Sequence, residues 1–74
     1  MELQTFQLKD GWGYQILIDK KVFIYQPTIP AIDSVKPFPD EVSAGKVGML
    51  VLKRLQSKQS PGVTPDEISH LLAY

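Results

Sequence analysis

Four prolines between residues 27 and 39 constrain the fold of this chain more than any other feature. They are Pro27, Pro30, Pro37 and Pro39. Each lacks a backbone N–H and holds φ at about −65°, so neither a helix nor a central strand can run through this stretch. The segment predicts an ordered crossover between regular elements on either side. The side chains available to anchor it are Ile29, Ile32, Val35 and Phe38.

The residues before the crossover predict three strands. Residues 3–8 alternate loosely between apolar and polar side chains, and an Asp-Gly turn signal follows them. Residues 14–18 and 22–26 are rich in β-branched and aromatic side chains, which favour strands. Because only residues 19–21 separate these two segments, they should form an antiparallel hairpin.

The register of this hairpin decides which of its side chains reach the core. A three-residue loop pairs Ile18 with Val22. It also pairs Ile16 with Ile24, so that four β-branched side chains share one face. A two-residue loop builds a different face, because a slip by one residue turns a whole strand over. That face would hold Tyr14, Ile16, Ile18, Phe23 and Tyr25.

We favour the three-residue loop, because it gives an aliphatic core face and leaves charged positions outside. By the same parity, Phe6 and Leu8 should join the core face. Either loop places a lysine near a position that requires a positive φ, a conformation that glycine adopts more readily. The outward face would then carry Gln15, Leu17, Asp19, Phe23 and Tyr25.

A long helix is predicted after the crossover. Asp40 is a suitable N-cap and Glu41 suits the first turn. Gly48 lies on the apolar stripe of this helix and predicts a close approach to the sheet, whereas the sequence offers no reason for Gly45. The stripe, at helical spacing, is Ala44, Val47, Gly48, Val51, Leu52 and Leu55.

A second, short helix follows a Ser-Pro-Gly break. Residues 64–67, Thr-Pro-Asp-Glu, combine a capping threonine, a proline in the first helical position and a glutamate three residues after the cap. The whole pattern predicts a single α+β domain over residues 1–74. It consists of a three-stranded antiparallel meander packed by one long helix, with the short helix last.

Composition excludes several classes of function. The chain has no cysteine, so it has no disulfide, thiolate ligand or thiol nucleophile. Its eight basic and eight acidic residues balance, whereas proteins that bind nucleic acid or anionic membranes usually carry a basic excess. No apolar run approaches the roughly 20 residues that cross a bilayer. We therefore expect neither a nucleic-acid partner nor a transmembrane segment. The first ten residues also lack the apolar block of a signal peptide.

No residue set predicts catalysis or metal binding. His70 follows Asp66 and Glu67 by four and three positions, but no second histidine or cysteine completes a metal site. Solvated side chains are the simpler interpretation. Asp33 and Ser34 are adjacent in the crossover and resemble turn chemistry. No serine has a nucleophile-elbow signature, so we expect no enzyme, no cofactor and no metal.

Two blocks of residues carry a family resemblance. They are Gly11-Trp12-Gly13-Tyr14-x-Ile16 and Gln26-Pro27-x-Ile29-Pro30-Ala31. In this order they resemble a family of small bacterial domains of unknown function, found mostly in Bacteroidetes as short exported proteins. The resemblance implies export, for example to the periplasm, with a leader absent from this chain. It implies no activity and no functional residues.

The aromatic residues are the candidate binding residues. In the favoured register, Leu17, Phe23 and Tyr25 lie on the face opposite the long helix, where exposed apolar area would indicate a partner surface. Alternatively the terminal helix covers that face. Trp12 is either a core plug or an exposed anchor. The leading hypothesis is a non-enzymatic exported domain acting by protein contact or self-association. The alternative is a small-ligand or peptide-binding module that uses Trp12, Phe23 and Tyr25.

Overall fold

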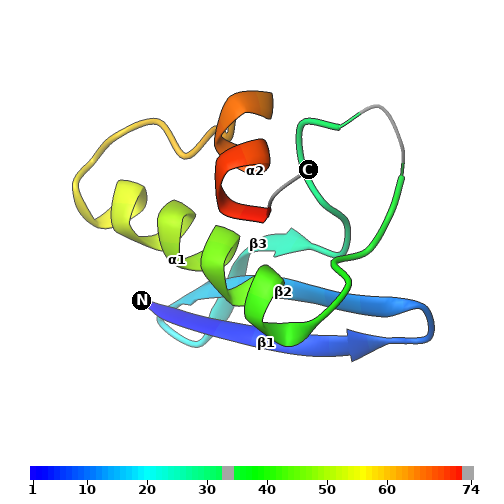
Figure 1. The fold of residues 1–74 in the computed structure, drawn as a ribbon. Coiled ribbons are helices and arrows are strands. Elements are labelled where there is room, and N and C mark those ends of the chain that lie inside the picture. Colours follow the sequence, from blue (N-terminus) through cyan, green and yellow to red (C-terminus); the bar gives the residue numbers. More distant parts are fainter. Residues whose placement is uncertain (33–34, 73–74) are drawn as a thin grey trace.

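Three antiparallel strands and two helices make up the computed structural model, which describes residues 1–32 and 35–72 (Figure 1). The sheet has the order β1-β2-β3, and the helices follow it in the chain. This arrangement confirms the predicted α+β fold. The elements are β1 (Glu2–Leu8), β2 (Gly11–Ile18), β3 (Lys21–Gln26), α1 (Glu41–Gln56) and α2 (Pro65–Leu72).

The core lies between α1 and the sheet. α1 crosses β1 and β2, and α2 packs on α1 (Figure 1). Gly48 permits the close approach of α1, because a Cβ at this position would lie 2.6 Å from Leu3 Cδ1 and 3.1 Å from Tyr14 Cγ. The predicted role of Gly48 is therefore confirmed. The buried apolar residues are Tyr14, Ile16, Ile29, Phe38, Ala44, Val47, Val51, Leu52 and Ile68.

Both helices begin where the sequence predicts. The Asp40 carboxylate accepts a hydrogen bond of 2.7 Å from the Ser43 backbone N–H, and this bond lowers the pKa of Asp40 below its usual range. At α2, the Thr64 N–H donates to Glu67 Oε1 at 3.0 Å, and the Glu67 N–H donates to Thr64 Oγ1 at 3.2 Å. These reciprocal bonds form the predicted capping box.

The hairpin between β2 and β3 combines the two registers that the sequence allowed. Its turn has two residues, Asp19 and Lys20, with φ of 52° and 66°, so Ile18 pairs with Lys21. The prediction of a three-residue loop and an Ile18–Val22 pair was wrong. A turn with positive φ at both central positions matches the twist of the strands, which offsets the absence of glycine.

A bulge at Phe23 then changes the register within β3. Leu17 pairs with Val22, but Ile16 pairs with Ile24, which leaves Phe23 without a partner on β2. The predicted pair of Ile16 with Ile24 is therefore confirmed. Val22 was predicted to be a core residue, and this was wrong because it lies opposite outward-facing Leu17 and is exposed.

The side chains of β1 that were predicted to face the core lie on the other face of the sheet. Phe6 pairs with Gly13 and Leu8 pairs with Gly11, which places both side chains on the face away from α1. Leu3 and Thr5 face the helix, and Thr5 Oγ1 donates to Glu41 Oε2 at 2.9 Å. The assignment of Phe6 and Leu8 to the core was wrong, because a two-residue turn joins β1 to β2 and sets the register.

The proline-rich crossover returns to the sheet and extends it. The Trp12 N–H donates to the Phe38 carbonyl, the Phe38 N–H donates to the Trp12 carbonyl, and both bonds measure 2.8 Å. A Cβ on Gly11 would lie 2.4 Å from that Phe38 oxygen, so glycine is needed there. Ile29 and Phe38 are buried anchors as predicted, whereas Val35 is 90% exposed and the prediction for it was wrong. Asp33 and Ser34 lie outside the described residues.

Candidate functional site

Exposed apolar side chains concentrate on β3. Val22, Phe23 and Tyr25 are 55%, 60% and 58% exposed, although valine, phenylalanine and tyrosine are side chains that folding usually covers. We call these three residues the β3 surface. Contiguous exposed apolar area of this kind usually marks a site of interaction.

The arrangement of the helices explains why β3 is uncovered. In the part of the chain that the structure describes, α1 packs on β1 and β2, and no part of its backbone comes close to β3. α2 packs on α1 and approaches no strand (Figure 1). Its apolar residue Ile68 joins the core through α1. The interpretation in which the terminal helix covers the outward face is therefore wrong.

Tyr25 is held in place by an aromatic stack. The rings of Tyr25 and Phe6 have centroids 5.1 Å apart and planes within 5° of parallel. Gly13 makes room for this stack, because a Cβ there would lie 2.6 Å from Phe6 Cζ. The Phe6 ring thus covers a glycine in the central strand and supports Tyr25 on the edge strand. Half of the Tyr25 side chain remains available to a partner.

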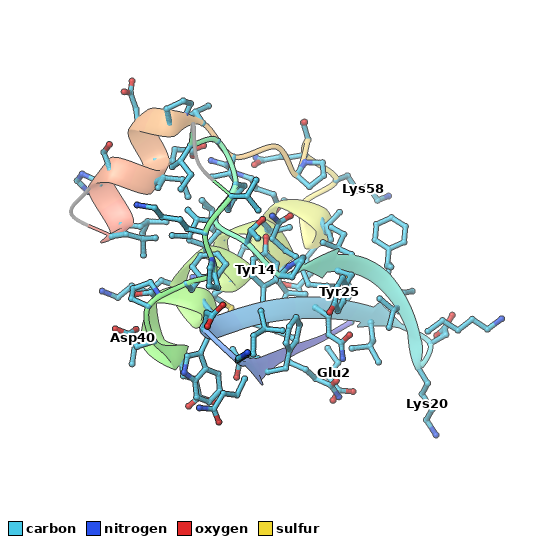
Figure 2. All side chains as sticks on the ribbon, turned by 90° about the vertical axis from the view of Figure 1, so that its right-hand side faces the viewer. Glu2, Tyr14, Lys20, Tyr25, Asp40 and Lys58 are labelled. Atoms are coloured by element: carbon cyan, nitrogen blue, oxygen red, sulfur yellow. The ribbon has the colours of Figure 1, made fainter. Side chains whose placement is uncertain are left out.

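The turn before β3 adds positive charge beside the β3 surface. Lys20 and Lys21 are exposed, and Figure 2 shows Lys20 projecting from the tip of the hairpin. By contrast, Tyr14 lies on the α1 side of the sheet, and its burial raises the pKa of its hydroxyl to about 12. The two faces of the sheet therefore differ. One packs into the core, and the other carries exposed aromatic and basic side chains along β3 and its turn.

The structure brings together three of the four predicted binding residues. Leu17 lies opposite Val22 on the outward face, Tyr25 lies opposite Gln15, and Phe23 is exposed in the bulge between them. Trp12 lies apart, because it is partly buried against the core and its backbone pairs with the crossover. Val22 was missed as a surface residue because a three-residue loop was expected, whereas the two-residue turn pairs Val22 with outward-facing Leu17.

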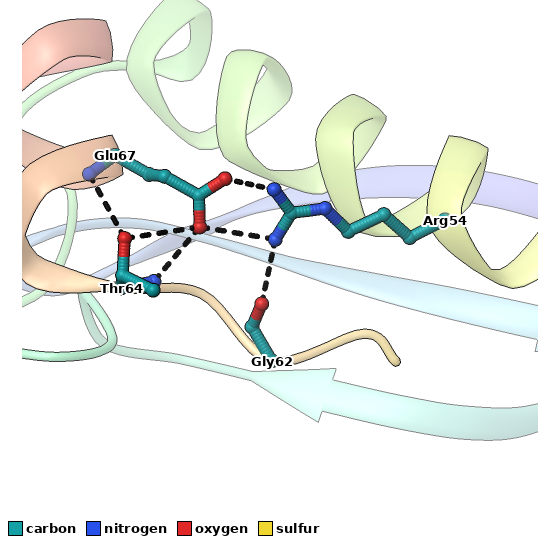
Figure 3. Close-up of polar contacts among 4 residues, drawn as sticks. All are labelled: Arg54, Gly62, Thr64 and Glu67. Atoms are coloured by element: carbon teal, nitrogen blue, oxygen red, sulfur yellow. Dashed lines mark hydrogen bonds and ion pairs between the residues drawn. The ribbon is translucent and has the colours of Figure 1, made fainter. Parts of the chain in front are cut away.

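A polar cluster joins the two helices. Arg54 Nη1 donates to the Gly62 carbonyl at 2.6 Å and to Glu67 Oε1 at 3.0 Å, while Arg54 Nη2 forms an ion pair with Glu67 Oε2 (Figure 3). Glu67 also accepts from Thr64, so its carboxylate is fully engaged (Figure 3). The capping box predicted the Thr64 contact, but no local pattern identified Arg54, which lies 13 residues from Glu67.

A groove of about 420 Å³ lies between α1 and α2. Its lining is mainly apolar, with His70 at its side, and Glu67 is already paired with Arg54. Within residues 1–32 and 35–72, no three histidine, aspartate or glutamate side chains lie close enough to hold a metal ion. The lining residues are Leu50, Asp66, Glu67, His70 and Leu71.

Neither helix in the described part of the chain combines the length and apolar content needed to span a membrane.

In comparisons with known proteins, residues 4–70 match the model of a family described as a domain of unknown function (DUF4907). No curated protein and no solved structure matches the chain significantly.

Proposed function

The chain belongs to this family of unknown function, so its role must be inferred from its own surface. We propose that it is a non-enzymatic domain that acts by protein contact through the β3 surface. The observation that carries the proposal is the exposure of Val22, Phe23 and Tyr25 on a strand that neither helix covers. A small domain has little apolar area to spare from its core, so three such side chains outside it require a reason.

The chemistry of the β3 surface supports a protein partner. Aromatic side chains are enriched in protein interfaces and carboxylates are depleted from their centres. β3 contains Phe23 and Tyr25 and has no acidic residue. The Tyr25 ring is oriented by its stack on Phe6, so less conformational freedom is lost when a partner packs on it.

A protein partner is favoured over the alternative of a small ligand. Small ligands bind in concave sites that enclose most of their surface. The groove described above is formed by α1 and α2 rather than by the β3 surface. Trp12, which the small-ligand hypothesis requires beside Phe23 and Tyr25, faces the other side of β2.

The proposal includes export, for which the support is the family resemblance. The natural reading frame provides the check. An apolar leader encoded upstream of Met1, or recovery of the native protein outside the cytoplasm, is the expected result. Recovery only from the cytoplasm of the natural host would contradict export and leave the contact proposal in place.

The contact proposal is tested by photo-crosslinking in the producing cell. Phe23 is replaced by the photoreactive analogue p-benzoylphenylalanine, and in a matched variant Met49 is replaced instead. Met49 is also an exposed apolar side chain, at 42%, but it lies on α1. We expect discrete adducts, to the same chain or to another protein, from position 23 and not from position 49.

Equal or absent adducts at the two positions would contradict the proposal. The double variant Phe23→Ser/Tyr25→Ser adds a second check, because it removes the aromatic rings from the surface. It should lose adducts formed from a photoreactive residue at position 22 while remaining folded by circular dichroism.

A further inference from the structure

The β3 surface also indicates what kind of partner it fits. Resting on the proposed function, we infer that this partner is a second copy of the chain. The two β3 strands pair antiparallel about a two-fold axis and join two three-stranded sheets into one of six strands. Three features carry this inference: a free strand edge, the charge pattern of β3 and the area that an interface needs.

β3 has an unpaired edge. It is the last strand of the sheet, with β2 on one side only. Among the described residues, the crossover makes its backbone bonds with Trp12 and within itself, and none of them reaches residues 21–26. Free N–H and C=O groups along an edge strand are a template for another strand.

The charge pattern of β3 favours its own antiparallel copy. Lys21 begins the strand, Gln26 ends it, and the residues between them are uncharged. Antiparallel pairing places Lys21 beside Gln26 of the other copy, so no like charges meet. Parallel pairing would instead bring the two copies of Lys21 together.

Area distinguishes strand pairing from a simple contact between patches. A buried aromatic side chain contributes about 150–250 Å², so the half-exposed β3 surface offers roughly 300 Å² per copy. Two patches together would fall short of the roughly 1,000 Å² expected of a specific interface. Pairing of the strand backbones adds the edge itself and the flanking residue Leu17 to the buried surface.

The other edge of the sheet limits the assembly to two copies. β1 carries Glu2, Gln4 and Gln7 and lacks an exposed aromatic residue. A β3–β3 contact uses the same surface in both copies and therefore closes, whereas a β3–β1 contact would continue into a fibre.

The inference is tested with the purified chain by sedimentation equilibrium and cysteine crosslinking. The native chain should show a monomer–dimer equilibrium between about 10 μM and 1 mM, the range of weak interfaces. The variant Val22→Ser/Phe23→Ser should raise the dissociation constant at least about tenfold, because it removes the central apolar contacts.

The absence of native cysteine makes the crosslinking unambiguous. A disulfide requires Cα atoms within about 7 Å. In an antiparallel pair, Phe23→Cys lies near the two-fold axis and should form a disulfide-linked dimer on oxidation. Lys21→Cys lies at the end of the same strand, about 17 Å from its counterpart, and should not. Met49→Cys on α1 is a second control.

A chain that stays monomeric at 1 mM, or that crosslinks equally from positions 21, 23 and 49, overturns the inference. Adducts to another protein from position 23 in cells would then leave the proposed function standing without the homodimer. A monomer that sediments with anionic vesicles, and loses this binding in Lys20→Ser/Lys21→Ser, would also overturn the inference and indicate a membrane surface instead.

Discussion

Two glycines in α1 have opposite surroundings. A Cβ at Gly45 would meet no atom within 4 Å, whereas at Gly48 it would press on Leu3 and Tyr14. Gly45→Ala should therefore stabilise the domain by about 0.5–1 kcal/mol through helix propensity. Gly48→Ala should destabilise it by about 1–3 kcal/mol through overpacking.

Urea unfolding of the two variants measures both effects. Each variant is the control for the other, because the same atoms are added to the same helix one turn apart. A loss of stability in Gly45→Ala would contradict the open surroundings of position 45.

The buried hydroxyl of Tyr14 should make the domain less stable in alkaline solution. Burial raises the pKa of its hydroxyl from 10.0 to about 12, so the folded state favours the neutral form. Its contribution is complete below pH 10, where the hydroxyl is neutral in both states, and is lost as pH rises from about 10 to 12. Tyr14→Phe should reduce that loss.

The free energy of unfolding, measured in urea at pH 8 and pH 11, provides the test. The native chain should lose more stability between these values than Tyr14→Phe. Tyr25→Phe is the control, because the Tyr25 side chain is 58% exposed. Equal losses in the native chain and Tyr14→Phe would contradict the assignment.

At the scale of elements, the sequence pattern correctly predicted the features that depend on neighbouring residues in the chain. The N-cap at Asp40, the capping box at Thr64 and the stripe of α1 all depend on residues within a few positions of one another. The parity of β1 and the bulge could not be predicted in this way. Both are set by pairing between strands: Leu8 pairs with Gly11 across a two-residue turn, and the bulge exists only in the pairing of β2 with β3.

The attachment of α2 is the element most sensitive to one pair of side chains. Arg54 links α1 to Gly62 and to Glu67, and both charged side chains are partly buried. Arg54→Met should destabilise the domain by about 1–2 kcal/mol, because a charge-assisted pair is lost and Glu67 keeps only its bonds to Thr64.

Hydrogen exchange measures this effect where it is expected. Amide protection in α2 should fall in Arg54→Met, while protection in β2 falls only as far as global stability does. Lys53→Met is the matched control, since it removes a neighbouring exposed cation of α1. An equal loss of α2 protection in both variants would show that charge in general, rather than this pair, holds the helix.

At the scale of the whole molecule, the exposure of two aromatic side chains was predicted correctly although the register on which it depended was not. Phe23 and Tyr25 are exposed as expected, although the expected loop was wrong. The bulge accounts for this result, because it restores the pair of Ile16 with Ile24 and so returns Tyr25 to the outward face. Val22 was assigned to the wrong face because its direction follows the two-residue turn, and the three-residue loop was favoured.

The thermal stability of the domain should depend on its own concentration. If two copies pair through β3, association stabilises the folded state. Above the dissociation constant, each tenfold increase in protein concentration should then raise the free energy of unfolding by at most about 1.4 kcal/mol per mole of bound partner. The unfolding midpoint of the native chain should rise between about 20 μM and 1 mM. In Val22→Ser/Phe23→Ser it should stay constant, and a constant midpoint in both chains would contradict pairing.

The two glycines around Trp12 affect how relatives of this domain should be recognised. Gly11 admits the returning crossover and Gly13 admits the Phe6 ring, so both satisfy steric demands of the backbone layout. Within this family, retention of Gly11 and Gly13 should therefore report the shared architecture and not a shared biological role. Subfamilies that share a partner should instead be sorted by the residues at positions 22, 23 and 25, which contribute little to the core and can diverge with the partner.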